Sequence, residues 1–450
     1  MARDKTCNLM TLLKTMYLKQ RNLFIVDDQL IQANEFLTAV MIRKEQLLTQ
    51  KQVYWAICSQ ESLYFVIDLF SVLLAKKIPV LLPNALTGTL SDLSEHYDGI
   101  LSDKDHEQSA DNQQLILNDK KLNIDQLTLD AKQTMILFTS GSSGKPKKII
   151  RTLANMNEEL NAIEKAFGCL VIDCVFYSSV LPQHLYGLTF YILWPLITGR
   201  LIATKRINYP EQLDPYLDKK TVFISSPGLL SRMTASVNLL EKLVILSSGG
   251  ALAYPDAQMI KKLMGIDVIE IFGSSETGAI AYRCQLKNPL WQVFKDVKIS
   301  QDQQGALLVE SPFFMQYKND AFVMNDQVKL VDQNYFQLLG RLDRIVKVES
   351  KRLSLDAMEQ KLKLSELVAD CYCLILESYR QFTAVVIVLS NVGKLKLEAN
   401  GKRAINDQLK QYLSNYFDAV LIPKKFRYVK KIPINSQSKI LLNEIKQLFD

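Results

Sequence analysis

The sequence has few histidines and tryptophans, and its cysteines form no familiar pattern. The 450 residues include three His, three Trp and seven Cys, an odd number without any Cys-x-x-Cys spacing. Neither a disulfide framework nor a cysteine zinc site is therefore indicated. Cys371 and Cys373 stand two residues apart in a strand-like run and so point to one face, which favours reduced, structural cysteine.

Long hydrophobic runs are also missing. Charged residues interrupt the most apolar windows, at Asp68, at Lys76 and Lys77, and at Asp173, so no run has the length of a membrane-spanning helix. The first residues, MARDKTCNLMTLL, have neither the apolar segment nor the small-residue cleavage site of a secretory signal. We expect a soluble, cytoplasmic protein without a membrane span.

Negative charge is scarce in the last quarter of the chain. From Arg341 onward there are 20 Lys and Arg against 12 Asp and Glu, whereas residues 1–340 contain 34 against 35. The surplus indicates either a solvated surface or a small domain that meets an anion, such as ATP, coenzyme A or an acidic partner protein. Nucleic acid is not favoured as a partner, because acidic residues are interleaved and no nucleic-acid motif is present.

The order of apolar segments predicts an α/β protein with more than one folding unit. A chain of 450 residues with 48% hydrophobic and 22% charged residues is globular and too long for one core. Helix-like and strand-like segments alternate through the first 340 residues, as in layered α/β folds whose sites lie at strand ends. The region 305–340 resembles an antiparallel β section, and a compact α+β unit follows. We place the boundary at Gly340 to Asp343, giving domains 1–340 and 341–450.

The stretch TSGSSGKPKK, residues 139–148, is the first candidate site. Gly141 and Gly144 permit backbone angles closed to other residues, so that successive N–H groups can converge on anionic oxygens. Hydroxyl and ammonium donors surround the two glycines: Thr139, Ser140, Ser142, Ser143, Lys145 and Lys147.

The same stretch differs from a Walker loop in spacing, and Pro146 stands where that loop has a metal-binding hydroxyl. Pro146 also opposes a helix, and KKIIRT after it is strand-like, so the stretch is expected to connect two strands of a hairpin. Considered alone, it is better explained as a Ser/Gly turn than as a nucleotide site.

TSGSSGKPKK nevertheless resembles the phosphate loop of the acyl-adenylate-forming ligases, the superfamily of acyl-CoA synthetases, aryl-CoA ligases and adenylation domains. Further segments resemble motifs of this family in the family's order: LPQHLYGL, SSGGALAYP, EIFGSSETGAI, the ribose and hinge region at 324–359, and KKIPINSQSKI. The resemblance implies a large N-terminal adenylate-forming domain of layered α/β subdomains and a small mobile α+β C-terminal domain. It places the hinge near Asp343.

The resemblance also implies an ATP site. The loop 139–144 and Lys147 would hold the phosphates, and Phe272 would stack on adenine. Gly249 and Gly250 would let the base approach the backbone, and Asp326 and Arg341 would hold the ribose hydroxyls. The resemblance also implies Gly273 and Ser275 as nucleotide-binding residues. Without the resemblance, Phe272 would be interpreted as a core aromatic, and the two charged residues as surface groups.

The catalytic residues implied are Lys147, His184, Glu276 and Lys439. Glu276, with Thr139, would hold Mg²⁺ together with phosphate oxygens, which is a usual magnesium site. Lys439 would offset the repulsion between a carboxylate and the α-phosphate that it attacks. His184 would border the acyl pocket beside the apolar run LYGLTFYILW. A surface Glu, an ordinary surface Lys, a structural His and a core helix are the alternatives.

The implied function is ATP-dependent adenylation of an aryl or medium-chain carboxylic acid, followed by acyl transfer to a pantetheine thiol. The sequence has Ser350 and Ser438 where the family usually has glycine. Ser350 stands where the pantetheine arm of the thiol passes in the family, which leaves the acceptor open between coenzyme A and an acyl carrier protein. The chain most resembles compact ligases of aryl polyene-type assembly lines, which implies the carrier protein. An ordinary CoA ligase, a luciferase-like oxygenase, a non-catalytic nucleotide-binding relative and a homodimer stay open.

Overall fold

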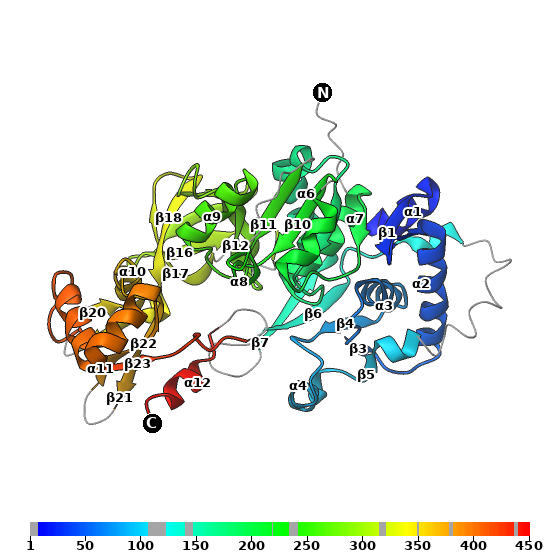
Figure 1. Cartoon of the computed structure of the whole chain (residues 1–450). Helices are drawn as coiled ribbons and strands as arrows, with labels where there is room; N and C mark the ends of the chain where they lie inside the picture. Colours follow the sequence, from blue (N-terminus) through cyan, green and yellow to red (C-terminus); the bar gives the residue numbers. More distant parts are fainter. Residues whose placement is uncertain are drawn as a thin grey trace. The chain divides into compact units, whose positions relative to one another are not determined.

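The computed structural model describes residues 8–106, 123–139, 147–217, 219–233, 242–314, 321–348, 351–377, 381–435 and 440–450. The chain divides into two compact units (Figure 1). The first comprises residues 1–299 and 309–322, and the second residues 300–308 and 323–450. The α/β class is confirmed. The domain boundary at Gly340 and the hinge at Asp343 remain predictions.

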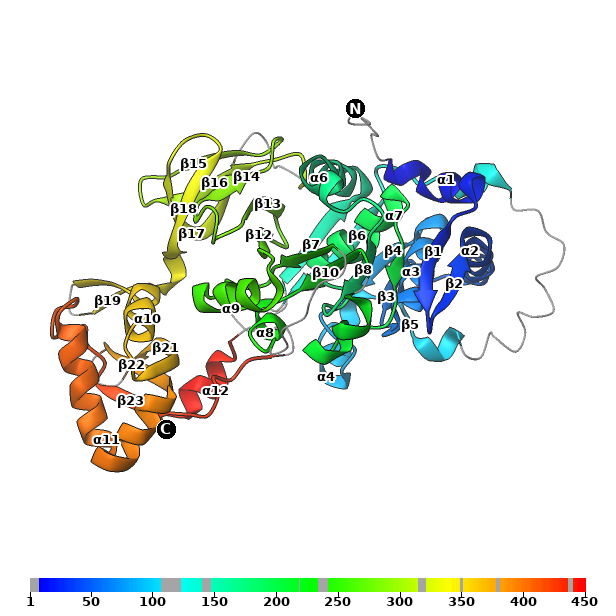
Figure 2. The same ribbon diagram turned by 45° about the horizontal axis from the view of Figure 1, so that its top comes forward.

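A five-stranded sheet in the first unit contains the two strands that flank the candidate phosphate loop. Its order is β5 (Gly99–Leu101), β3 (Tyr54–Ile57), β4 (Ile78–Leu81), β6 (Thr134–Thr139) and β7 (Lys147–Thr152). All neighbours are parallel except β6 and β7, which form the expected antiparallel pair. Helix α3 (Ser62–Leu74) packs on β3 and β4, and α2 (Ala33–Leu48) packs on α3, as Figure 2 shows.

A second sheet in this unit is parallel at its centre, where β8 (Val175–Ser178), β10 (Thr221–Ser225), β11 (Leu243–Ser247) and β12 (Ile269–Ser274) follow one another. One flank consists of β9 (Ile202–Ala203), β1 (Asn22–Val26) and β2 (Gln29–Gln32). The other flank has antiparallel β13 (Gly278–Arg283) and β14 (Trp291–Val293). Since β10 and β11 are buried at every residue, the sheet is covered on both faces, which explains their uninterrupted apolar runs.

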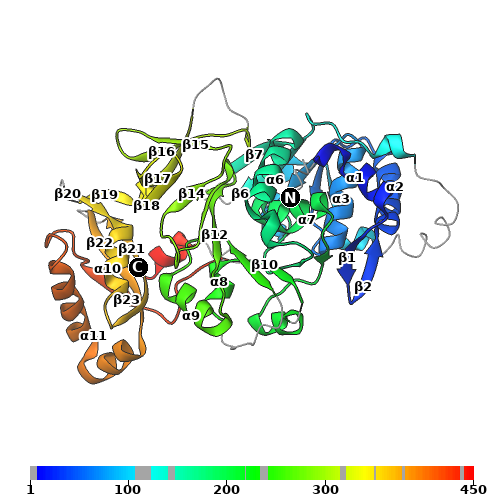
Figure 3. The ribbon, with the colours of Figure 1, turned by 90° about the horizontal axis from the view of Figure 1, so that it is seen from above.

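Helices of the first unit connect and cover these strands (Figure 3). The helix α6 (Leu153–Phe167) begins directly after β7, and the Thr152 side chain caps it by accepting a hydrogen bond from the Asn155 amide. Gly187–Leu193 forms a π-helical segment, η5, that continues into α7 (Trp194–Thr198), and all seven of its residues are buried. The helices α8 (Pro227–Leu230) and α9 (Tyr254–Met264) follow β10 and β11.

The second unit contains β17 (Phe322–Leu330) paired with β18 (Tyr335–Arg341), then a short hairpin of β19 (Ile345–Val348) and β20 (Lys351–Ser354). A three-stranded sheet follows: β21 (Val368–Glu377), β22 (Gln381–Leu389) and β23 (Lys425–Tyr428). The remaining elements are α10 (Leu355–Lys363), α11 (Asn391–Ser414), which is interrupted at Gly401, and α12 (Leu442–Gln447). The expected α+β unit is therefore present.

The two neighbouring cysteines of β21 are buried, as expected of structural cysteine. Cys371 and Cys373 lie on the buried face of β21 in an apolar cluster, and both are free thiols. Burial raises the pKa of both thiols, which keeps them protonated at neutral pH. Among the helices of the described ranges, none is both long and apolar enough to cross a membrane.

Candidate active site

The backbone of the candidate phosphate loop is framed by a regular hairpin. Thr139 at the end of β6 pairs with Lys147 at the start of β7, and the register continues to Thr134 and Thr152. The predicted loop residues Ser140, Gly141, Ser142, Ser143 and Gly144 lie outside the described residues. Both strands of the expected hairpin are thus confirmed, while the phosphate-binding role of the loop stays a prediction.

Lys147 and Glu276 form the central contact of the site. The Lys147 ammonium donates a hydrogen bond from Nζ to Glu276 Oε1 at 2.8 Å, across 129 positions of sequence. The Lys147 side chain is 56% exposed and that of Glu276 24% exposed. Burial acts to raise the pKa of Glu276, but the hydrogen bond and charge of Lys147 outweigh it, so the pKa lies below its ordinary value. Glu276 is therefore a carboxylate at neutral pH.

The turn between β12 and β13 fixes the position of Glu276. Thr277, fully buried, accepts a hydrogen bond from the Ser274 amide and returns one from its own amide to Ser274 Oγ. Gly278 then has φ of +72°, and a Cβ there would meet the Glu159 carboxylate at 2.7 Å. The turn therefore needs glycine for both conformation and space. The predicted nucleotide-binding residues Gly273 and Ser275 belong to this same turn region.

The expected adenine side forms at the carboxyl ends of neighbouring parallel strands, β11 and β12. Gly249 and Gly250 follow β11 and are exposed. A Cβ on Gly249 would have no other atom within 4 Å, so the space beside this residue is open. The Ser248 hydroxyl donates to the Ile271 carbonyl at 3.0 Å, which connects this turn to the strand that ends with Phe272. The structure thus brings these three predicted residues to one edge of the sheet.

Phe272 has an aromatic support that the sequence did not indicate. The Trp291 ring on β14 lies 5.2 Å from the Phe272 ring, centroid to centroid. The guanidinium of Arg283 in turn stacks on the Trp291 ring, 4.4 Å from its centroid. Two hydrogen bonds to Glu270, at 2.8 and 3.1 Å, hold this guanidinium in place. The orientation of Phe272 is therefore set by a packed chain of side chains on β12, β13 and β14.

His184 lies on the connection that leaves the carboxyl end of β8, six residues after the strand. The Ser179 hydroxyl on that connection is 2.9 Å from Ser225 Oγ at the end of β10. His184 is half-buried, and its carbonyl accepts a hydrogen bond from the Leu188 amide at 2.8 Å. Because the apolar run 185–194 is buried except at the half-buried Tyr186, its burial is that of a core helix, and its role beside an acyl pocket stays a prediction.

Asp326 and Arg341, the predicted ribose ligands, are cross-strand partners in the second unit. The two residues face each other in the β17–β18 ladder, and Arg341 Nη1 lies 4.0 Å from Asp326 Oδ2. The Asp326 side chain is 12% exposed, and the Arg341 side chain 46%. A carboxylate in this position can accept hydrogen bonds from both hydroxyls of a diol.

The segment after Arg341 is attached to α10 on both sides of Asp343. Asp356 accepts a hydrogen bond from the Arg341 amide at 2.9 Å and also bonds the guanidinium of Arg344. Arg344 further pairs with Glu359, and its guanidinium lies 4.3 Å from the centroid of the Tyr372 ring. Lys439, Ser350 and Ser438 lie outside the described residues, so the roles assigned to them stay predictions.

The groups at Glu276 fit a magnesium ion that is bound mainly by water and phosphate oxygens. Within the described part of the chain, His, Cys, Asp and Glu form no group of three or more suited to a metal. Mg²⁺ commonly uses one or two carboxylates together with substrate phosphates and waters. Glu276, ionised and next to the phosphate-loop strand, is a carboxylate of that kind, and the backbone of Thr139 ends the facing strand.

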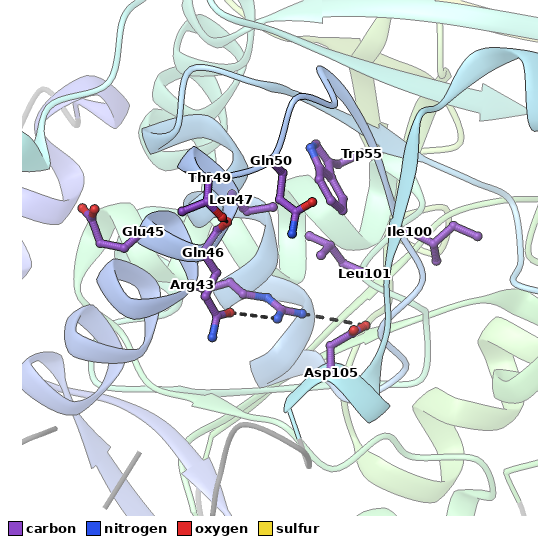
Figure 4. A pocket seen from close by; sticks show the side chains of 10 residues that line it. All are labelled: Arg43, Glu45, Gln46, Leu47, Thr49, Gln50, Trp55, Ile100, Leu101 and Asp105. Carbon is purple, nitrogen blue, oxygen red and sulfur yellow. Dashed lines mark hydrogen bonds and ion pairs between the residues drawn. The ribbon is translucent and has the colours of Figure 1, made fainter. Parts of the chain in front are cut away.

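The pocket in Figure 4 includes none of the predicted site residues. It lies where the end of α2 meets β3 and β5. Arg43 in it donates from Nη1 to Gln46 at 3.1 Å and has an ion-pair partner, Asp105, at 3.8 Å. Arg43 Nε also bonds Asp68, which is fully buried and contacts His106 Nε2 at 3.0 Å. This set of paired charges connects α2 with α3 and is explained as a structural network.

Two further buried charges near the site escaped the sequence analysis. Arg151 on β7 and Glu159 on α6 are 0% and 1% exposed and form an ion pair at 2.5 Å. No local pattern marks them, because Arg151 stands in a short strand of mixed polarity and Glu159 in an amphipathic helix. Trp291 was missed for a similar reason, since its contact with Phe272 depends on the pairing of β13 with β14.

Three known proteins with similar sequences are named as ligases or as a synthetase. The chain is 23% identical over 371 residues to malonate–CoA ligase of Arabidopsis thaliana, and 24% identical over 372 residues to acetyl-coenzyme A synthetase of Pasteurella multocida. Each alignment covers 70% of this chain, but only 60% and 56% of those proteins. A D-alanine–D-alanyl carrier protein ligase of Staphylococcus epidermidis is 20% identical over 69% of this chain and 70% of its own.

Solved structures confirm the fold over nearly the whole chain. ATP-bound MatB from Rhodopseudomonas palustris superposes with a TM-score of 0.81 at 14% identity, covering 98% of this chain and 99% of that one. o-Succinylbenzoate CoA synthetase from Bacillus subtilis, in complex with its acyl-adenylate intermediate, gives 0.77 at 18% identity, with 97% and 98% covered. The sequence model of the family described as AMP-binding enzyme matches residues 56–333. Because this match includes more than half of the residues of the chain, the chain belongs to the AMP-binding enzyme family.

Proposed function

We propose that the protein adenylates a carboxylic acid with ATP and then transfers the acyl group to a pantetheine thiol of an acyl carrier protein. The observation that supports this most directly is the 2.8 Å contact between Lys147 and Glu276. It connects the strand that leaves the phosphate loop with the carboxylate suited to Mg²⁺, as a site for a nucleoside triphosphate requires. An aryl or medium-chain acid is the proposed substrate, from the apolar run after His184.

In the first step, a carboxylate oxygen of the acid attacks the α-phosphorus of ATP, and pyrophosphate leaves. Both reactants are anions, so the site must offset their repulsion as charge develops on the leaving group. Lys147 and Lys439 supply positive charge, Phe272 and the Gly249–Gly250 turn hold the base, and Asp326 holds the ribose. A magnesium ion at Glu276 would neutralise phosphate charge and orient the leaving pyrophosphate.

In the second step, a pantetheine thiol attacks the acyl carbonyl, and AMP leaves. The thiol loses its proton during the attack, since a free thiol with a pKa of about 8.5 is a weak nucleophile at neutral pH. We propose that the C-terminal part turns near Asp343 between the two steps, so that Lys439 serves the first and the thiol enters for the second. This proposal follows from the resemblance stated above.

Surface charge favours an acidic carrier protein as the thiol donor. Six Lys and Arg and no Asp or Glu occur in residues 421–440. Four of the lysines in this segment are exposed: Lys424, Lys425, Lys430 and Lys431. Such a basic surface would attract an acidic partner and raise its association rate. The similarity to a D-alanyl carrier protein ligase points the same way, and the narrower likeness to aryl polyene ligases remains a prediction.

Coenzyme A is the second candidate acceptor. The relatives in Arabidopsis thaliana and Pasteurella multocida are named for CoA, and the phosphates of CoA would also be attracted by exposed lysines. Charge reversal can separate the two acceptors. Lys424→Glu with Lys430→Glu is expected to raise the KM for holo carrier protein about 10-fold, with pyrophosphate exchange unchanged. Lys394→Glu with Lys402→Glu on α11 is the control with equal charge change.

The experiment that tests the proposal is acid-dependent exchange of labelled pyrophosphate into ATP, over a panel of aryl and alkyl acids. One acid is expected to support exchange, because adenylation is reversible. With that acid, acyl transfer is then compared between holo carrier protein and coenzyme A. No exchange with any acid of the panel would contradict adenylation, and transfer to CoA alone would replace the carrier protein as acceptor.

A further inference from the structure

Two contacts attach β7 to the segment 276–279, which includes the end of the β12–β13 turn and the start of β13. One contact is direct, and the other passes through Glu159 on α6. At the start of β7, Lys147 bonds Glu276 at 2.8 Å. Near its end, Arg151 donates from Nη2 to Glu159 Oε2 at 2.5 Å, and the other carboxylate oxygen of Glu159 accepts the Ala279 amide at 2.9 Å. On β7 the two attached residues, Lys147 and Arg151, lie four positions apart, which is about 13 Å along an extended strand. Their partners on the second segment, Glu276 and Ala279, lie three positions apart.

Both attachments use the same face of β7. Side chains alternate along a strand, so Lys147, Ile149 and Arg151 point to one side and Lys148 and Ile150 to the other. The burial agrees at the inner positions, since Ile149 and Arg151 are buried whereas Lys148 and Ile150 are exposed. Lys147, at the start of the strand, is also exposed. A slip of β7 by one residue would turn this face away from the β12–β13 turn and separate Lys147 from Glu276.

Stability alone does not explain why the second attachment, the Arg151–Glu159 ion pair, consists of two buried charges. Arg151 is fully buried, and its Nε and Nη1 have no hydrogen-bond partner among the described residues. Burial disfavours the charge on both Arg151 and Glu159, and each charge offsets part of that cost for the other. A well-packed apolar pair at such a place is often equally stable or more so. An ion pair here does offer something an apolar pair does not, which is a fixed geometry between β7, α6 and the Ala279 amide.

We propose that Arg151 and Glu159 are positioning residues for adenylation, because their ion pair fixes β7 against the start of β13 and so holds Lys147 opposite Glu276. The inference rests on the proposed function. Neither residue contacts the reacting groups in this arrangement. Their effect passes through the hairpin that supports Lys147 and through the turn that supports Glu276, where even a shift of about 1 Å can reduce a rate about 100-fold.

The first test is the double variant Arg151→Met with Glu159→Gln. It removes both buried charges, so no unpaired charge remains, and the Gln oxygen can still accept the Ala279 amide. The matched control is Arg200→Met with Glu164→Gln, since Glu164 also lies on α6 and forms two hydrogen bonds with Arg200 at 2.7 and 2.9 Å. The control pair contacts neither β7 nor β13 in the described structure.

In the test variant, kcat/KM for MgATP in pyrophosphate exchange is expected to fall about 10-fold or more, while the thioester-forming half-reaction from synthetic acyl-AMP stays within about 2-fold. The control variant is expected to retain both activities. A merely structural role would lower both half-reactions together, in step with the melting temperature, and that outcome would overturn the proposal. Equal loss of exchange in the control variant would also overturn it.

Two measurements keep the inference decidable if the double variant does not fold or if the proposed function fails. Arg151→Lys retains the charge but loses the planar fork, and the same selective loss of exchange is expected from it. Amide hydrogen exchange of peptides covering 147–152 and 274–283, in the protein without ligand, is expected to speed up in this variant and not in the Arg200 control. Unchanged protection of both peptides would refute the proposal that the Arg151–Glu159 pair fixes β7 against β13, whether or not the protein adenylates an acid.

Discussion

Lys147 and Glu276 contact each other at 2.8 Å, although one begins β7 directly after the candidate phosphate loop and the other lies in the turn between β12 and β13. The contact keeps Glu276 ionised, because the neighbouring ammonium lowers its pKa against the effect of burial. It also gives Lys147 a partner in the protein without nucleotide. In the proposed function, a substrate phosphate would replace Glu276 as the partner of Lys147, and a metal ion would replace Lys147 as the partner of Glu276.

The first prediction concerns the acid limb of activity. Without Lys147 the carboxylate of Glu276 loses the interaction that lowers its pKa, so Lys147→Met should raise that pKa and shift the loss of Mg²⁺-dependent exchange to higher pH. Magnesium titrations of pyrophosphate exchange at several pH values between about 5 and 8 measure the shift. Glu276→Gln should instead lower exchange about 100-fold at every pH. An identical acid limb in wild type and Lys147→Met would contradict the assigned contact.

The second prediction concerns the ribose. If Asp326 accepts hydrogen bonds from the ribose hydroxyls, the wild type should prefer ATP over 2′-deoxy-ATP, and Asp326→Asn should reduce this preference about 10-fold. The ratio of kcat/KM values for the two nucleotides is the measurement, since it cancels general losses of activity. Asp407→Asn, a change of an exposed carboxylate on α11, is the control. A ratio in Asp326→Asn equal to the wild-type value would remove Asp326 from the ribose site.

The third prediction concerns stability and pH. Burial raises the pKa of Glu359 from 4.5 to about 7, and the nearby Arg344 opposes the rise without cancelling it. At a pH between these two values, Glu359 is protonated in the folded state but has lost its proton in the unfolded state. Stability from this group is therefore complete below about 4.5 and is lost as the pH rises to about 7.

Chemical denaturation of wild type and Glu359→Gln between pH 5 and 8 checks this sign. The difference in free energy of unfolding between the two proteins should change with pH by at most about 1.4 kcal/mol per unit, with the wild type losing stability relative to the variant as pH rises. Asp356 and Lys363 also lie near Glu359 and are retained in both proteins, so their contributions cancel to first order. A pH-independent difference would show that Glu359 ionises normally.

The sequence predicted those parts of the site that depend on local pattern. The hairpin around the loop follows from two apolar runs separated by Gly, Ser and Pro, and β6 and β7 form it. Gly249 lies just after β11, where layered α/β folds have their sites. The Arg151–Glu159 pair and the contact of Trp291 with Phe272 could not be predicted in this way, because each depends on which distant strands become neighbours.

The last prediction concerns Lys439, which the resemblance assigns to adenylation alone. Lys439→Ala should lower pyrophosphate exchange by about 100-fold or more, because the positive charge that would stabilise the leaving pyrophosphate is lost. The same variant should convert synthetic acyl-AMP and thiol to thioester at nearly the wild-type rate, since that step forms no pyrophosphate. Lys446→Ala, an exposed lysine on α12, is the control and should leave both half-reactions unchanged. If exchange by Lys439→Ala were near normal, the residue would have no catalytic role; if both half-reactions fell equally, the division of labour between the two steps would be wrong.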